Sequence, residues 1–152
     1  MLFEKDVFIS YAHIDDEALS EGLKGWITEF HKALEVRLSQ LLGEEPRIWR
    51  DSKLQGNDFF TPEIESQFQK LKIMISVVTP RYVRSEWCNK EVTLFYKAAK
   101  DTGGVIVENK SRIFKVIKTP VELEEQPEIM RGLLGYKFFK REREDSAPIE
   151  FG

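Results

Sequence analysis

The sequence is poor in the residues that build disulfides and metal sites. It holds one cysteine, Cys88, and two histidines, His13 and His31, in 152 residues. A single cysteine excludes an internal disulfide and suits a reducing compartment, so we expect a cytoplasmic protein. Zinc sites need several clustered ligands, which these scattered residues do not supply. We therefore predict no metal site, and both histidines are interpreted as structural or exposed.

Long apolar runs and an excess of positive charge are missing as well. The longest apolar run, at 73–78, is far shorter than a membrane span, and the first residues lack the basic and then apolar pattern of a signal peptide. The formal net charge is -3, so no cationic excess is available to neutralise the phosphates of a nucleic acid. Neither GxGxxG nor GxxxxGK[ST] occurs, which leaves a dinucleotide-binding Rossmann fold and a P-loop unsupported. We expect neither a membrane nor a nucleic-acid partner.

The composition is that of one soluble globular domain. Apolar residues make up 41% of the chain and charged residues 32%, which is typical of a domain with a real core. Apolar runs predict strands at 7–11, 47–50, 73–78, 112–118 and 136–139. Helices are predicted at about 18–42, 61–71, 86–100 and 127–134. The first of them is expected to begin effectively near Lys24, because Gly22 and Gly25 weaken its first turns.

The alternation of strands and helices predicts an α/β fold. Such an order implies a parallel sheet with helices on both faces, joined by right-handed crossovers. We expect a flavodoxin-like three-layer sandwich with a five-stranded parallel sheet in the order 2-1-3-4-5. Ligands of such sheets bind outside the carboxyl ends of the strands, at the switch point between the first and third strands. This places two segments beside the expected ligand, Ser10 to Asp16 and Thr79 to Glu91.

The run from Ser85 to Glu91 is the most informative part of the chain. Glu91 falls early in a predicted helix, and Trp87 lies four residues before it on the same helix face. The pair can form a reactive carboxylate beside an aromatic wall. It can equally be ordinary amphipathic packing, with a glutamate favoured by the helix dipole and a tryptophan in the core. Cys88 is interpreted as a small buried residue rather than a nucleophile, because no histidine lies near it in sequence.

Two further groups follow predicted strands. Arg50, Asp51 and Lys53 come after the second strand, where the cations could hold a phosphate or form surface ion pairs. Asp15 and Asp16 could mimic the acidic pair of a phospho-receiver domain. The third strand, however, ends in Val78-Thr79-Pro80 without the aspartate that would accept the phosphoryl group. We therefore reject the phospho-receiver interpretation.

Three stretches resemble the Toll/interleukin-1 receptor (TIR) domain family. Residues 6–11, DVFISY, resemble its first box, and residues 48–59, IWRDSKLQGNDF, resemble its second strand and BB loop. Residues 85–91, SEWCNKE, resemble the segment that carries the family's catalytic glutamate. The resemblance spans residues 6–140 in the family's order and spacing. The bacterial branch fits best, given the extended first helix with Trp26 and Phe30.

The resemblance implies an activity and a set of site residues. Catalytic members of the family cleave the nicotinamide–ribose bond of NAD and release nicotinamide with ADP-ribose or a cyclised ADP-ribose. By matching position, Glu91 would be the essential carboxylate. The residues implied to bind or border the substrate are Ser10, Tyr11, Ala12, Arg50, Asp51, Lys53 and Trp87. NAD would be the substrate, and no cofactor is implied.

The resemblance also implies partners and alternatives. Many relatives are non-catalytic homotypic signalling modules that self-associate through the BB loop, here residues 50–59. In catalytic relatives, assembly often completes the site. A nucleoside deoxyribosyltransferase is a third interpretation, against which the TIR-like loop argues. We expect residues 1–140 to form the TIR domain and 141–152 to be a charged tail or linker to a further domain, in a bacterial protein of antiphage defence.

Overall fold

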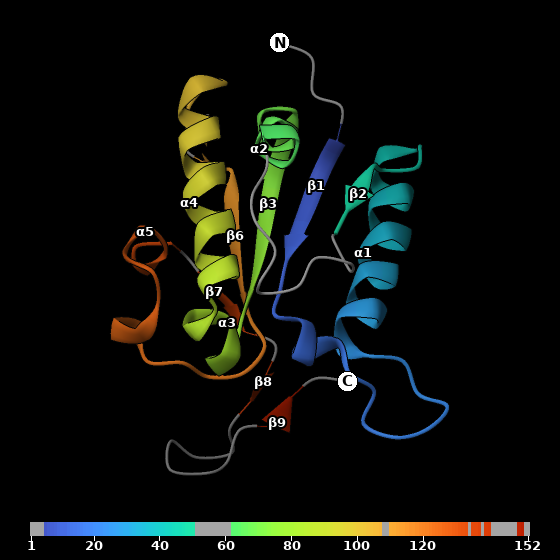
Figure 1. Cartoon of the computed structure of the whole chain (residues 1–152). Helices are drawn as coiled ribbons and strands as arrows, with labels where there is room; N and C mark the ends of the chain where they lie inside the picture. Colours follow the sequence, from blue (N-terminus) through green and yellow to red (C-terminus); the bar gives the residue numbers. More distant parts are fainter. Residues whose placement is uncertain are drawn as a thin grey trace.

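A computed structural model describes residues 5–50, 62–107, 110–133, 135–137, 139–140 and 149–150. Figure 1 shows a sheet at the centre with helices around it. Asp51, Lys53 and the remainder of the predicted BB loop beyond Arg50 lie outside the described residues. Residues 141–148 and 151–152 of the predicted tail also lie outside the described residues.

Five strands form one parallel sheet in the order β2-β1-β3-β6-β7. They are β1 (Lys5–Ser10), β2 (Ile48–Trp49), β3 (Leu71–Val78), β6 (Ile113–Ile117) and β7 (Gly135–Lys137). Counted along the chain, this is the predicted order 2-1-3-4-5. The chain steps from β1 outward to β2 and then back to β3 on the other side of β1, so the switch point lies between β1 and β3 as predicted.

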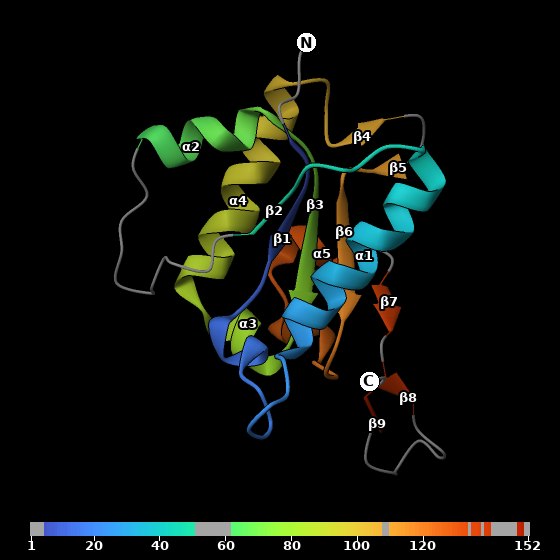
Figure 2. The same ribbon diagram turned by 90° about the vertical axis from the view of Figure 1, so that its right-hand side faces the viewer.

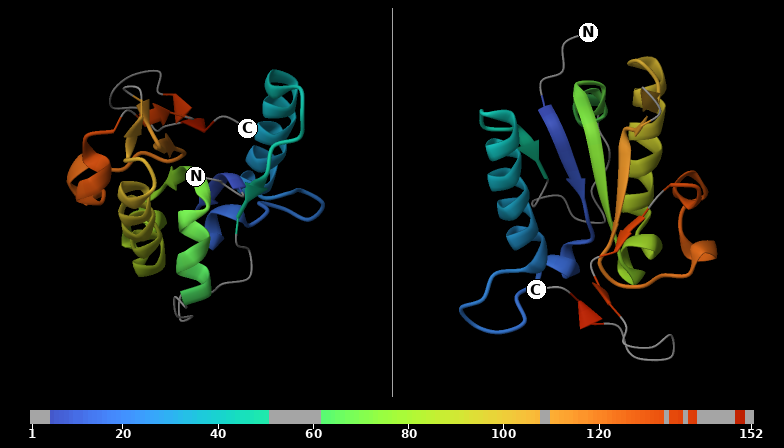
Figure 3. Two further views of the ribbon diagram at one scale, coloured as in Figure 1. Left: turned by 90° about the horizontal axis from the view of Figure 1, so that it is seen from above. Right: turned by 180° about the vertical axis from the view of Figure 1, so that it is seen from behind.

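The sheet is covered on both faces, which confirms the three layers (Figure 3). Helix α1 (Trp26–Leu42) packs on one face, and helices α2 (Pro62–Gln69) and α4 (Glu86–Asp101) pack on the other. Alternation along β1 sorts its side chains between the two cores. Val7 and Ile9 join Ile27 of α1, whereas Phe8 joins Phe68 of α2.

Helix α1 begins later than the pattern predicts, at Trp26 rather than near residue 18 or Lys24. Gly22 takes a left-handed backbone conformation, with φ of 84°, so the segment before the helix turns instead of coiling. The helix ends as predicted. Gly43 is left-handed, with φ of 76°, and its N–H donates to the Ser39 carbonyl.

The short helix α3 (Pro80–Arg84) leads from β3 to α4 and is not among the predicted helices. The Thr79 side chain caps it by accepting from the Tyr82 N–H at 3.1 Å, and Pro80 opens its first turn. Helix α2 ends at Gln69 rather than at 71, because Leu71 starts β3 and is fully buried there. Helix α4 matches the predicted 86–100 to within one residue.

The remaining elements are short. The 3-10 turn η1 (His13–Asp16) lies between the predicted strand at 7–11 and the predicted first helix, and η2 (Leu123–Glu125) with α5 (Glu128–Arg131) joins β6 to β7. Strands β4 (Ile106–Val107) and β5 (Lys110–Ser111) form a small hairpin near the end of α4, visible in Figure 2. Strands β8 (Phe139–Lys140) and β9 (Ile149–Glu150) pair antiparallel outside the main sheet. Within the described parts of the chain, no helix is long and apolar enough to cross a membrane.

Candidate functional site

A cavity of about 320 Å³ opens at the carboxyl edge of the sheet, beside the predicted switch point. Its lining comes from two segments, one directly after β1 and the other spanning α3 and the start of α4. The lining residues are Tyr11, Ala12, His13, Ile14, Arg81, Ser85, Trp87 and Cys88. This volume lies at the lower end of the range for small-molecule sites. Both segments are those that the switch-point argument selects from the sequence.

The walls combine aromatic rings with the positive charge of Arg81. Tyr11 is buried and its ring lies 5.3 Å from that of His13, while Trp87 is half-buried. The side chains of His13 and Arg81 are exposed. No acidic residue is among the eight described lining residues. An aromatic, cationic cavity of this kind suits a flat, anionic ligand.

Glu91 lies behind this cavity rather than in its lining. The residue is only 5% exposed, although it is a carboxylate in the second turn of α4. The Ser10 hydroxyl donates to Glu91 Oε1 at 3.0 Å, and Ser10 Oγ lies 2.8 Å from the Tyr82 hydroxyl. Burying a carboxylate is costly unless donors compensate, and this chain of hydroxyls supplies one. The structure thus brings together Ser10 and Glu91, two of the residues that the family resemblance implies for the site.

The start of α4 is fixed by a cap that also shapes the cavity. Ser85 accepts from the Cys88 N–H at 3.1 Å, and it is itself a lining residue. Because Trp87, Cys88 and Glu91 follow directly in the first two turns, this cap sets where each of them points. The run SEWCNKE is therefore a helix start whose candidate site residues are held by local hydrogen bonding.

Cys88 lines the cavity but is not a reactive thiol. The residue is 2% exposed. Burial, followed by the nearby Glu91 carboxylate, raises the pKa of its thiol from 9.0 to about 12. Nucleophilic cysteines need the opposite shift, because the thiolate is the attacking form. The geometry therefore supports the interpretation of Cys88 as a packing residue.

A second contact ties the two lining segments together. The Thr79 hydroxyl donates to the Asp15 carboxylate at 2.5 Å, which joins the end of β3 to the turn after β1. Thr79 is 1% exposed and also caps α3. The cavity is thus bounded by loops that are bonded to each other. The hydrogen bond with Thr79 gives Asp15 a structural role, which explains this aspartate without a phospho-receiver site.

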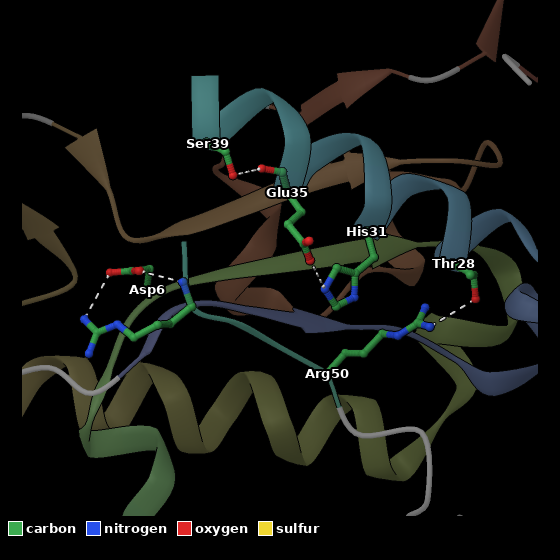
Figure 4. A network of polar contacts seen from close by, with 7 residues as sticks. Asp6, Thr28, His31, Glu35, Ser39 and Arg50 are labelled. Atoms are coloured by element: carbon green, nitrogen blue, oxygen red, sulfur yellow. Dashed lines mark hydrogen bonds and ion pairs between the residues drawn. The ribbon is translucent and has the colours of Figure 1, made fainter. Parts of the chain in front are cut away.

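Arg50 belongs to a different network, on the α1 side of the sheet edge. Its Nη2 donates to the Thr28 hydroxyl at 3.0 Å and its Nη1 lies 3.6 Å from Asp16 Oδ2 (Figure 4 shows the contact with Thr28). Asp16 in turn accepts from the Thr28 N–H at 2.7 Å, which caps α1 from outside the helix. The guanidinium lies over the Tyr11 ring, 5.6 Å from its centre, so Arg50 supports a wall of the cavity from behind.

The sequence singles out several of these residues individually and others only as a region. Tyr11, Ala12 and Trp87 line the cavity, while Ser10 and Glu91 are outside its lining and bond to each other. Asp51 and Lys53 fall outside the described residues. The lining residues not singled out by the sequence are His13, Ile14, Arg81 and Ser85. All four lie in the two segments that the predicted strand order places at the switch point, so the topology predicts their region.

Within the described ranges, no three His, Cys, Asp or Glu side chains cluster as a metal ion requires. No curated protein matches the chain. Among solved structures, the TIR domains of the activated Roq1 resistosome, which directly recognizes the pathogen effector XopQ, share 16% identity with a TM-score of 0.53. That match covers 80% of this chain and 61% of the other.

A second similar structure is a metazoan TIR-STING receptor from C. gigas in complex with 2',3'-cGAMP. It has 17% identity, a TM-score of 0.51, and a match over 87% of this chain and 34% of the receptor. The chain thus spans less than two thirds of the length of either structure. At such identities the likeness shows the fold. A family model described as TIR domain matches residues 7–150, nearly the whole sequence, and the chain therefore belongs to the TIR domain family.

Proposed function

We propose that this chain is an NAD glycohydrolase that cleaves the nicotinamide–ribose bond, with Glu91 as its essential carboxylate. TIR domains include NAD-cleaving enzymes as well as non-catalytic signalling modules. The observation that carries the proposal is the buried Glu91 carboxylate, bonded to Ser10 beside an aromatic and cationic cavity. A glutamate that served only solubility would not be 5% exposed and bonded to a serine of β1.

The chemistry asks little more of the protein than one placed carboxylate. When the bond from ribose to the pyridinium nitrogen breaks, its electron pair neutralises that nitrogen, so nicotinamide leaves without acid help. The ribose becomes oxocarbenium-like and carries the charge that needs stabilisation. A carboxylate about 4 Å away, at an effective dielectric near 20, would interact with it by about 4 kcal/mol. That corresponds to roughly three orders of magnitude in rate.

Two outcomes are open to the oxocarbenium-like ribose. Water can attack it and lose a proton, which gives ADP-ribose, or a group of the adenosine part can attack, which gives a cyclic product. Trp87 and Tyr11 would hold the flat nicotinamide or adenine ring, and Arg81 would face the phosphates. Ala12, Arg50, Asp51 and Lys53 remain proposed border residues.

The biological setting is part of the same proposal. We infer that the chain is an effector domain of a bacterial antiphage defence protein and that self-association, through the loop at 50–59, activates it. One similar structure is a resistosome and thus an assembly, which supports the idea of activation by assembly. A non-catalytic scaffold is the alternative, and the placement of Glu91 outside the cavity lining favours it.

The deciding experiment is to incubate the concentrated chain with NAD, with and without a crowding agent, and to separate nicotinamide, ADP-ribose and cyclic products. We expect nicotinamide release by the wild type and none by Glu91→Gln. Glu86→Gln is the matched control, since Glu86 is exposed on the same helix. Turnover by folded Glu91→Gln would reject the assignment of Glu91. A wild type that releases no nicotinamide under crowding would favour the scaffold.

A further inference from the structure

Tyr82 is the largest fully buried side chain of the described core and carries a polar group into it. It stands on α3 with 0% exposure, and its hydroxyl lies 2.8 Å from Ser10 Oγ, on β1. A buried phenol needs a partner for its O–H, and a backbone carbonyl would serve that need. The partner here is instead the serine that contacts Glu91. Three elements, β1, α3 and α4, thus meet through one line of hydroxyl and carboxylate oxygens.

The direction of the hydrogens in this line follows from counting them. A serine hydroxyl has one proton, and Ser10 donates it to Glu91 Oε1 at 3.0 Å. The contact between Ser10 and Tyr82 must then use the phenol proton, so Tyr82 donates and Ser10 accepts. Each donor polarises the next, and the line ends on a carboxylate, where hydrogen bonds are strongest.

We propose that Tyr82 is a positioning residue for the reaction, which through Ser10 fixes the orientation of the Glu91 carboxylate and favours its charged form. This inference rests on the proposed function, because it assigns Tyr82 a task in service of Glu91. Tyr82 does not line the cavity, so its effect is transmitted by Ser10 and not by contact with substrate. The Thr79 cap on the Tyr82 N–H holds the phenol in place at the start of α3.

The hydroxyl line from Tyr82 through Ser10 to Glu91 is surrounded by buried titratable groups. Burial, and then the Cys88 thiol and the Glu91 carboxylate, raise the pKa of Tyr82 well above 10.0, so the phenol keeps its proton. Besides burial, the charges of Glu91 and Asp15 raise the pKa of Cys88, and the charge of Arg81 lowers it. The described groups whose pKa the Glu91 carboxylate raises are Tyr82 on α3 and Cys88 on α4. Of these, Tyr82 is the one whose donated proton reaches Glu91 through Ser10.

The test is a double-mutant cycle on NAD cleavage with Tyr82→Phe, Ser10→Ala and the double variant. We expect Tyr82→Phe to lower kcat about tenfold and to leave KM within about twofold, as the loss of one hydrogen bond in a charged network predicts. If Tyr82 acts through Ser10, adding Tyr82→Phe to Ser10→Ala should cost nothing further. Tyr96→Phe, the same change in a partly buried residue of α4, is the control. Independent, multiplying effects, or wild-type kcat in Tyr82→Phe, would overturn the proposal.

A second measurement separates this proposal from the proposed function, since it needs no activity. The side-chain carboxyl carbon of Glu91 is followed by NMR through a pH titration in the wild type, Tyr82→Phe, Ser10→Ala and Tyr96→Phe. Removing a donor to a carboxylate disfavours its charged form, so the midpoint should move to higher pH in the first two variants and not in Tyr96→Phe. An unchanged midpoint would reject the role of Tyr82 whether or not the chain cleaves NAD. Ser10→Ala breaks the line from the other side, should Tyr82→Phe fail to fold.

Discussion

Ser10 donates a hydrogen bond of 3.0 Å to Glu91 across 81 positions of sequence. The two residues meet because β1 and α4, the second helix after β3, converge at the switch point of the sheet. Both are almost fully buried, at 1% and 5% exposure. The contact turns a glutamate that could have been a surface residue into a carboxylate held inside the fold, next to a cavity that can take a ligand.

Alkaline pH should destabilise the domain through Cys88. Its pKa rises from 9.0 in the unfolded chain to about 12 in the fold, so the thiol keeps its proton longer when folded. Above pH 9 the folded state then binds more protons than the unfolded state, and the free energy of unfolding falls as the pH rises toward 12. Tyr82, whose pKa is also raised, acts in the same direction. Urea unfolding at several pH values between about 8.5 and about 10.5 measures this slope.

Two variants separate the thiol from other alkaline effects. Cys88→Ala should flatten the slope, because it removes the titrating group. Val92→Ala lies one turn further along α4 and is also buried, so it lowers stability at every pH and should keep the wild-type slope. An equal slope in Cys88→Ala and the wild type would show that the thiol does not titrate differently in the fold.

Arg81 should contribute to substrate affinity through its charge. It lines the cavity, whereas Arg84 of the same short helix does not, and both are exposed. An exposed charge pair contributes at most about 1 kcal/mol, so Arg81→Gln should raise KM for NAD up to about fivefold with kcat unchanged. The difference should shrink as salt is added, because salt screens exposed charges. Steady-state kinetics at two salt concentrations, with Arg84→Gln as control, measure this. Equal effects of the two variants would contradict a phosphate contact at Arg81.

Arg112 should be essential to stability rather than to chemistry. It is 7% exposed at the edge of the sheet opposite the cavity, and its guanidinium bonds the carbonyls of Leu71, Ala99 and Gly104 among others. A lysine cannot reproduce this fork, so Arg112→Lys should lose about 3 kcal/mol of the free energy of unfolding. Arg37→Lys, on the exposed surface of α1, should change it by less than about 0.5 kcal/mol. Urea denaturation of both variants decides, and a small loss in Arg112→Lys would refute the role.

The fold could be predicted from local patterns because apolar runs in the sequence mark the strands of the sheet. The apolar runs at 7–11 and 73–78 become β1 and β3, and the alternation with helices correctly implies the order of the sheet. Helix α3 was also predictable in principle. Thr79-Pro80 is a cap and first-turn pair that can start a helix, but directly after an apolar strand the same pair also marks the end of that strand.

The parts that could not be predicted depend on partners distant in sequence. The strand at 112–118 alternates poorly because Lys115 is buried, and its amine donates to the side chain of Gln126 and the carbonyl of Met130. The burial of Glu91 depends in the same way on Ser10 and Tyr82. The late start of α1 depends on Asp16, which caps Thr28 from twelve residues away. No local pattern carries these pairings.

Gly25 should tolerate no side chain, because of where it lies against the turn after β1. A Cβ at Gly25 would come 1.7 Å from the Asp16 carbonyl oxygen and 2.4 Å from the Asp16 carbonyl carbon, so the backbone itself would have to shift. Asp16 also caps α1 through Thr28 and pairs with Arg50. Displacing it would therefore disturb the helix start and the support behind Tyr11 together. Gly25→Ala should cost about 3 kcal/mol in the free energy of unfolding.

The matched change is Gly132→Ala, at the end of α5. Gly132 has right-handed helical angles, with φ of -87° and ψ of -1°, and a Cβ there would meet no atom within 4 Å. An alanine fits those angles and restricts the unfolded chain, so this variant should be neutral or stabilised by less than about 1 kcal/mol. Urea unfolding of both variants beside the wild type gives the comparison. Since both exchanges add the same methyl group, equal stability of the two variants would show that the approach of Gly25 to Asp16 is not a constraint on the fold.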